Sequence, residues 1–195
     1  MSKNISDYEL IMRFIKGEQS SFEKLVTRHK NKVFAYISLY IRDQALAEDI
    51  FQDTFLKVIQ SVKSGKYADA GKFISWVMRI SHNLIIDHFR RVKQMNTISN
   101  DNYESDLFNS KAFAENNVED DMIKRQIQKD VRKMISQLPD DQREVVILRH
   151  YAGLSFKEIA DVTDVSINTA LGRMRYALIN MRRLMIDNKI SLTVS

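Results

Sequence analysis

The segment LSFKEIADVTDVSINTALGRMRYAL, residues 154–178, contains two helical patterns separated by only three residues. Ser155 and Glu158 form an S-x-x-E capping box, in which the hydroxyl and the carboxylate each satisfy a backbone donor left free at a helix start. Asp164 stands where the turn requires a left-handed residue, which Asp tolerates better than most non-glycine residues. Ser166 is suited to cap the next helix. The segment therefore predicts two helices joined by a sharp turn.

The second helix of this segment combines an apolar seam with a polar face that carries arginines. The seam comprises Ala170, Met174, Ala177, Leu178, Met181, Leu184 and Met185. The polar face comprises Asn168, Thr169, Arg173, Arg175 and Tyr176. This pattern is typical of a helix-turn-helix, whose second helix can enter the major groove, where arginine pairs with guanine. The alternative is a solvated helix face in an ordinary bundle, but the capping, the short turn and the cationic face together favour DNA.

The composition of the whole chain favours an all-α protein with two small domains. At 195 residues and 44% hydrophobic content, the chain can bury one larger core or two small ones. Five glycines and one proline leave few breaks in the helical patterns. The sequence contains no cysteine, which excludes disulfides, thiolate metal sites and a cysteine nucleophile. The start MSKNISDYEL is unlike a signal peptide, and no apolar run approaches the ~20 residues of a membrane span. We therefore expect a soluble, cytoplasmic protein without direct membrane insertion.

Charge divides the chain into two basic blocks around an acidic segment. Residues 1–95 carry 16 basic and 10 acidic side chains, residues 96–121 carry 1 and 7, and residues 122–195 carry 13 and 8. The middle segment is rich in Asn and Ser and lacks an apolar period, which predicts a flexible acidic linker. We therefore expect small domains at residues 1–95 and 122–187, joined by the linker 96–121 and followed by a tail, 188–195.

Apolar spacing predicts a helical bundle for the first block. Core-facing positions on its first helices are Leu10, Ile11, Phe14, Ile15, Phe22, Leu25, Val26, Val33, Phe34, Ile37 and Ile41. Further helices are expected from about Asp43 to Val62 and from Phe73 to Lys93, the latter with a basic far end. In the second block, Pro139 suits the first turn of a helix that should stop near Gly153.

Three segments together give the chain a resemblance to a known family. They are AEDIFQDTFLKV, FISWVMRISHNLIIDHFRR and LPDDQREVVILRHYAGLSFKEIADVTDVSINTALGRMRYAL. In order and spacing they resemble the bacterial extracytoplasmic-function (ECF) group of RNA polymerase sigma factors. The likeness covers both basic blocks. It implies a transcription initiation factor with two helical domains, regions two and four, that binds core RNA polymerase and directs it to the near (−10) and distant (−35) promoter elements.

The resemblance implies that the helix matching residues 47–59 docks on the clamp helices of the largest polymerase subunit. The candidate contact residues are Glu48, Asp49, Gln52, Asp53, Phe55 and Leu56. An acidic and amide face suits a helical partner that carries arginines. The alternative is that Phe55 and Leu56 fill the bundle while the acidic side chains are solvated.

By the same resemblance, residues 73–93 and the loop before them meet the near element and help to melt it. Melting requires a pocket for an extruded base and cations for the strand. The candidate residues are Tyr67, Lys72, Arg79, Asn83, Arg90 and Arg91. Trp76 and Phe89 lie on the apolar stripe and are expected in the core. Because binding energy drives melting, we expect neither an enzyme nor a cofactor.

Region four is implied to read the distant element through the helix-turn-helix. The candidate residues are Lys157, Ser166, Asn168, Thr169, Arg173, Arg175 and Tyr176, of which the first two are expected to hold phosphates. Common family members have a basic residue followed by serine where this chain has Leu171 and Gly172, and arginine where it has Tyr176. These departures leave the base preference open.

The resemblance also implies further partners. They are the flap of the second-largest polymerase subunit and, by family habit, an anti-sigma factor. The acidic linker can pass through a positively charged polymerase channel that normally holds nucleic acid, and a solvated spacer is the alternative.

Two other classes of protein stay open at the level of sequence. A stand-alone helix-turn-helix regulator would account for the second block without any polymerase. An enzyme would need a reactive centre, and His82, Asp87 and His88 lie within two helical turns. Their spacing matches no common ligand pattern, so no metal is expected.

Overall fold

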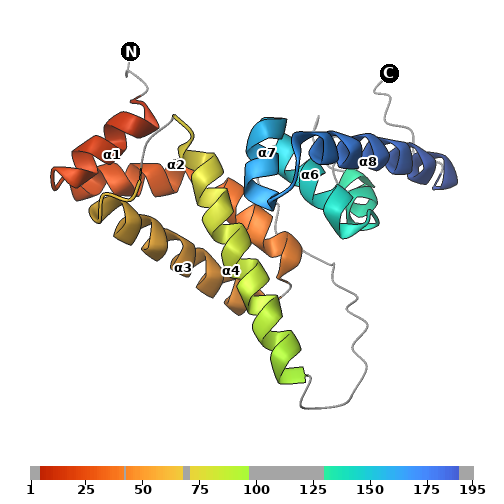
Figure 1. Cartoon of the computed structure of the whole chain (residues 1–195), viewed down its shortest axis with the longest axis horizontal. Coiled ribbons are helices and arrows are strands. Elements are labelled where there is room, and N and C mark those ends of the chain that lie inside the picture. Colours follow the sequence, from red (N-terminus) through yellow and green to blue (C-terminus); the bar gives the residue numbers. More distant parts are fainter. Residues whose placement is uncertain (1–4, 42, 68–70, 97–129, 189–195) are drawn as a thin grey trace, which may run out of the picture. The chain divides into compact units, whose positions relative to one another are not determined.

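A computed structural model describes residues 5–41, 43–67, 71–96 and 130–188 (Figure 1). Every regular element in these residues is a helix, which confirms the predicted all-α fold. The helices belong to two compact units, one containing α1 to α4 and the other α6 to α8. Nearly all of the predicted linker and tail lies outside the described residues, so their boundaries stay predictions.

The first unit is a four-helix assembly whose helices begin at local signals. The helices are α1 (Asp7–Ile15), α2 (Gln19–Tyr40), α3 (Gln44–Lys63) and α4 (Phe73–Asn96). At the start of α1, the hydroxyl of Ser6 accepts a hydrogen bond from the backbone N–H of Glu9 at 3.2 Å. At the start of α3, a carboxylate oxygen of Asp43 accepts one from the N–H of Leu46 at 3.0 Å. Both caps satisfy donors that the helix itself cannot pair.

Helix α2 forms the centre of this unit, because α1, α3 and α4 all pack against it. Leu25, Val33 and Ile37 on α2 are completely buried. At one end, the ring of Phe22 lies 4.8 Å from the ring of Phe14 on α1 and 6.3 Å from that of Phe55 on α3, measured between centroids. This core leaves the outer faces of α3 and α4 exposed.

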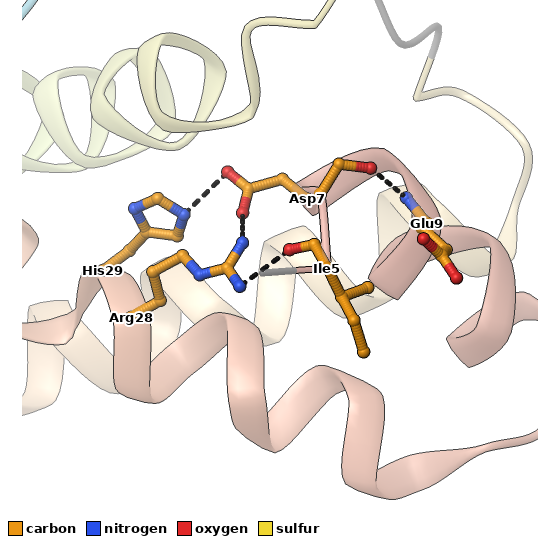
Figure 2. A network of polar contacts seen from close by, with 6 residues as sticks. Ile5, Asp7, Glu9, Arg28 and His29 are labelled. Carbon is orange, nitrogen blue, oxygen red and sulfur yellow. Dashed lines mark hydrogen bonds and ion pairs between the residues drawn. The ribbon is translucent and has the colours of Figure 1, made fainter. Parts of the chain in front are cut away.

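A polar cluster holds the start of α1 against α2 (Figure 2). The carboxylate of Asp7 lies 2.5 Å from a guanidinium nitrogen of Arg28 and 2.8 Å from Nε2 of His29. Arg28 also donates a hydrogen bond to the carbonyl oxygen of Ile5 at 2.8 Å. His29 is buried against the ring of Phe73, and its Nδ1 atom has no hydrogen-bond partner among the described residues. Burial lowers the pKa of His29 below its ordinary value, although Asp7 acts in the opposite direction.

The second unit contains α6 (Asp140–His150), α7 (Phe156–Thr163) and α8 (Ile167–Asp187), and residues 130–136 are also helical. Both α6 and α7 pack against α8. Pro139 lies one position before α6, with an extended ψ of 147°, rather than inside its first turn. The core includes Val145, Leu148, Ile159 and Ala170, all completely buried.

Arg143 organises the start of the second unit from inside its core. Its guanidinium donates hydrogen bonds to the carbonyl oxygens of Ile135, Ser136 and Leu138 at 3.2, 3.1 and 2.5 Å. Ile135 and Ser136 lie in the last turn of helix 130–136 and Leu138 lies just beyond it, where the helix itself supplies few backbone donors for these carbonyls. A carboxylate oxygen of Asp140 lies 3.0 Å from the same guanidinium. The buried charge is therefore hydrogen-bonded and paired, as burial of an arginine requires.

Two predicted core positions are wrong. Ile15 is 52% exposed, because the nine-residue α1 buries only the narrow stripe that contains Leu10, Ile11 and Phe14. Leu178 is 46% exposed because it follows the buried Ala177 and so points about 100° away around the helix. The seam is also less buried beyond this point, since α8 has 21 residues and its neighbours α6 and α7 have only 11 and 8.

Candidate nucleic-acid interface

The turn between α7 and α8 has the predicted geometry. The backbone N–H of Glu158 donates to the Ser155 hydroxyl at 3.3 Å, and the N–H of Ser155 donates to the Glu158 carboxylate at 2.8 Å, which completes the capping box. Helix α7 ends at Asp164, which is left-handed with φ 53° and ψ 47°. The hydroxyl of Ser166 then accepts from the backbone N–H of Thr169 at 3.0 Å. The short turn thus redirects the chain into α8 without leaving the helix starts uncapped.

The polar face of α8 consists of two adjacent rows spaced three or four residues apart. Thr169, Arg173 and Tyr176 form one row, and Asn168, Gly172 and Arg175 form the other. Of these, Asn168, Thr169, Arg175 and Tyr176 are exposed. Lys157 is exposed on α7. These rows offer the amide, hydroxyl and guanidinium groups that contact bases and phosphates in a major groove.

Three of the predicted groups already have partners within the protein. The hydroxyls of Ser166 and Thr169 lie 2.8 Å apart and both belong to the cap of α8. Arg173 is only 25% exposed, and its Nε atom lies 3.3 Å from a carboxylate oxygen of Asp141 on α6. Local sequence patterns did not predict the role of Asp141, because this contact joins two helices that are distant in the chain.

Helix α4 presents a second cationic face. Arg79, Asn83 and Arg90 lie in one exposed row, which Ile86 completes with an exposed apolar side chain. Arg90 forms a local ion pair with Asp87 at 3.3 Å, and both side chains are largely in solvent. Arg91 is also exposed but lies off this row, and Lys72 is exposed at the position directly before α4. Such a face attracts a phosphate backbone without a fixed geometry.

Tyr67 lies before α4 in an aromatic cluster and is half-buried. Its ring centroid is 4.5 Å from that of Trp76 and 6.1 Å from that of Phe73. Trp76 and Phe89, both predicted in the core, are half-buried as well. The cluster therefore exposes part of its aromatic surface beside the cationic row, and a stacked base needs such a surface.

The outer face of α3 carries five of the six residues predicted there. Glu48, Asp49, Gln52, Asp53 and Leu56 are exposed, and Leu56 is 54% accessible. Phe55 is the exception and needs correction, because it is 6% exposed and its ring lies 4.9 Å from that of Phe51 inside the bundle. Its position on the stripe with Ala47 and Val58 turns it inward. We therefore remove Phe55 from the candidate contact face.

The part of the chain that the structure describes contains no cluster of three or more His, Asp or Glu residues arranged to hold a metal ion. His82, one of the residues weighed for such a site, instead has its Nδ1 atom 2.9 Å from the hydroxyl of the buried Tyr36. Within the same residues, none of the helices combines the length and apolar character that crossing a membrane requires.

Comparison with known proteins defines the class. The family description "Sigma-70 region 2" matches residues 25–94, and "Sigma-70, region 4" matches residues 128–175. The first match spans α3 and α4, and the second contains α6 and α7 and reaches into α8. The chain is therefore a sigma-70-type protein with both of these regions, and a stand-alone regulator would leave the first match unexplained.

Whole-chain comparison gives the family. The chain is 31% identical to the ECF RNA polymerase sigma-E factors of Salmonella typhimurium (strain LT2) and Escherichia coli (strain K12), over 97% of this chain and of each relative. It is 27% identical to that of Haemophilus influenzae, over 97% of this chain and 98% of the relative. The protein belongs to the ECF family of RNA polymerase sigma factors, transcription initiation factors that direct RNA polymerase to promoters.

Two solved structures have the same fold at low sequence identity. One is the sigma factor RpoE in complex with the anti-sigma factor NepR from Bartonella quintana, with a TM-score of 0.65, 21% identity and coverage of 84% of this chain and 96% of that one. The other is CnrH in complex with the cytosolic domain of CnrY, with a TM-score of 0.62, 22% identity and coverage of 94% and 99%.

Proposed function

We propose that the chain holds core RNA polymerase through the outer face of α3 and brings it to a promoter that α4 and α8 contact at two separate elements. The observation that carries this proposal is the capped turn between α7 and α8, with Asp164 left-handed, which presents an exposed polar face at the start of α8. A helix held in this way can enter a major groove with its first turns toward the base edges.

The outer face of α3 supports the polymerase contact. Its carboxylates, on Glu48, Asp49 and Asp53, lie within about two turns before an exposed leucine, Leu56, so that an apolar contact would have acidic charge beside it. Interfaces commonly combine a buried apolar anchor with a polar rim. The clamp helices of the largest subunit are the proposed partner, and arginines there would pair with Asp49 and Asp53. Region four is proposed to contact the flap of the second-largest subunit.

The row on α4 supports contact with the near element and its melting. Unstacking a base costs a few kcal/mol per step, which charge attraction and stacking must offset. Arg79 and Arg90 supply exposed charge, and Asn83 supplies hydrogen-bonding groups for an unpaired base. The half-buried Tyr67 and Trp76 lie in the same unit as a stacking surface. Separation of the DNA strands needs no covalent step by this protein, so we propose neither catalysis nor a cofactor.

Other proposed features follow from the same role. Residues 96–121 are proposed to act as an acidic linker that passes along a positively charged polymerase channel. An anti-sigma factor is proposed as an inhibitory partner. Of the two fold relatives above, one is bound to the anti-sigma factor NepR and the other to the cytosolic domain of CnrY. Work on RNA polymerase and DNA would place the protein in the cytoplasm.

Run-off transcription tests the proposal directly. Purified core RNA polymerase, with and without the protein, is supplied with a library of genomic templates, and the start sites are sequenced. We expect new start sites that share two separated elements and that depend on the protein. If the protein neither binds core polymerase nor creates such sites, the proposed function is wrong.

Charge reversal on α3 separates polymerase binding from DNA binding. Asp49→Lys with Asp53→Lys is expected to weaken association with core polymerase at least tenfold, because two attractions become repulsions at an interface. Glu23→Lys with Glu9→Lys is the control, because these exposed carboxylates lie on α2 and α1. Equal loss for both pairs in a titration with labelled core polymerase would contradict the assignment to α3.

A further inference from the structure

A carboxylate from another helix holds one arginine of the α8 polar face. The Nε atom of Arg173 lies 3.3 Å from Oδ2 of Asp141 in the first turn of α6, and three quarters of the arginine side chain is covered. Arg175, in the neighbouring row of α8, is exposed and has no ion pair within the described part of the chain. The two arginines therefore differ in how freely they can move.

The carboxylate that holds Arg173 also contacts the backbone of its own helix. Its other oxygen, Oδ1 of Asp141, accepts a hydrogen bond from the backbone N–H of Gln142 at 2.9 Å. A negative charge in the first turn of a helix is also favoured by the helix dipole. Gln142 in turn accepts a hydrogen bond from the side-chain amide of Asn180 on α8 at 2.7 Å. The start of α6 is thus joined to α8 by two side-chain contacts, Asp141 with Arg173 and Gln142 with Asn180.

The two terminal nitrogens of Arg173, which would contact a base, stay available in the pair with Asp141. Asp141 lies against Nε, and the terminal nitrogens Nη1 and Nη2 make no hydrogen bond with the described residues. Those two nitrogens can donate in parallel to O6 and N7 of guanine. Because the side chain is already restrained, less rotamer freedom is lost when the contact forms. A phosphate contact, in contrast, would be weakened by a neighbouring negative charge.

We propose that Asp141 is a positioning residue that aims Arg173 at a guanine of the distant promoter element. This inference rests on the proposed function of α8 and deepens it, because it assigns base specificity to a residue of α6. The same negative charge repels the phosphates of any DNA that approaches this face. Asp141 therefore lowers affinity for unrelated DNA while it raises preference for one base pair.

The test measures base preference in the intact holoenzyme. Core RNA polymerase carrying the full chain is bound, at one fixed salt concentration, to promoter duplexes with a randomised distant element, and the bound fraction is sequenced. The wild type is expected to prefer guanine at one position, and Arg173→Ala is expected to lose that preference. Asp141→Asn is expected to reduce it about three- to tenfold, as for the weakening of one bidentate contact. The affinity of the Asp141→Asn holoenzyme for DNA without the element should equal or exceed that of the wild type.

Asp140 provides a matched control for the loss of charge. It lies in the same turn of α6, but its carboxylate pairs with Arg143 at 3.0 Å rather than with α8. Asp140→Asn should therefore leave the guanine preference unchanged. The double variant Arg173→Ala with Asp141→Asn should match Arg173→Ala alone in base preference, because Asp141 affects that preference only through Arg173.

The outcomes separate this inference from the proposed function. If Asp141→Asn keeps the wild-type guanine preference while Arg173→Ala loses it, the inference is wrong and the role of α8 stands. If Arg173→Ala changes no base preference, the assignment of Arg173 fails and the inference fails with it. Should Asp141→Asn unfold, Asp141→Glu keeps the charge but displaces the carboxylate by one methylene. That variant is expected to weaken the preference without changing non-specific binding, and an unchanged preference would overturn the inference.

Discussion

The two helices proposed to meet promoter DNA hold their cations in different ways. On α4, Arg79 and Arg90 are exposed, and the ion pair of Arg90 is local and solvated. On α8, Arg173 is mostly covered and is held by a carboxylate of a separate helix. A strand that is being separated changes shape, so a mobile cationic row suits it. A duplex that is being read presents fixed donors and acceptors, so a restrained arginine suits it.

The largest expected effect comes from removing Arg143, which organises the start of α6, the helix whose Asp141 restrains Arg173. Arg143→Met should lower the free energy of unfolding of the second unit by about 3 kcal/mol, because three backbone carbonyls, two of them in buried hydrogen bonds, lose a charged donor. Urea unfolding measures the change, and hydrogen exchange assigns it to residues 130–188. Arg149→Met is the control: Arg149 is exposed and donates only to the carbonyl of Leu154 at 2.8 Å among its hydrogen bonds. Equal losses of stability for Arg143→Met and Arg149→Met would contradict the special role of Arg143 in the core.

The next largest effect is a difference between Arg173 on α8 and Arg79 on α4 in how they contribute to DNA binding. Arg173→Ala should cost about 1–3 kcal/mol of discrimination at one base pair of the distant element. Arg79→Ala should instead weaken binding to all sequences alike and reduce the slope of log affinity against log salt by about 1. Holoenzyme titrations with matched and mismatched promoters at several salt concentrations measure both quantities. A sequence-specific loss for Arg79→Ala would contradict the contrast between the helices.

A smaller gain is expected at Gly172 in the middle of the polar face. A Cβ atom added there would meet no other atom within 4 Å, so packing does not require glycine. Gly172→Ala should raise the stability of the second unit by about 1 kcal/mol, since alanine restricts the unfolded chain and favours the helix. Thermal unfolding followed by circular dichroism measures the gain. No rise in stability would indicate that α8 is not a regular helix at this position in solution.

The smallest expected effect is a loss of stability in acid that the first unit shows because of His29. The pKa of buried His29 is lowered in the folded protein, so the unfolded chain binds a proton more readily. Its contribution to stability is complete above the ordinary histidine pKa of about 6.5 and is lost as the pH falls below that value. His29→Gln removes this titration and can still donate to Asp7. Urea unfolding at pH 7.5 and 5.5 should show a smaller acid-induced loss in the first unit for His29→Gln than for the wild type. An equal loss would exclude His29 as the cause.

The sequence predicted local features best. The capping box, the left-handed Asp164 and the Ser166 cap are encoded by neighbouring residues, and all three occur in the structure. The role of Phe55 was mistaken because similarity to a family aligns a position without saying which side of the helix it occupies. Its spacing from Ala47 and Val58 already indicated the core. The pair of Asp141 and Arg173 could not be predicted, because it depends on how α6 packs across α8.

The single tryptophan of the sequence, Trp76, gives the protein an internal fluorescent reporter. It is half-buried at the start of α4, and its indole lies 4.5 Å from the ring of Tyr67. A nucleobase that stacked on this pair would quench the indole emission. Stopped-flow mixing of the holoenzyme with promoter DNA, compared with a Trp76→Phe holoenzyme to subtract the emission of the polymerase's own tryptophans, could therefore time strand opening separately from the initial encounter.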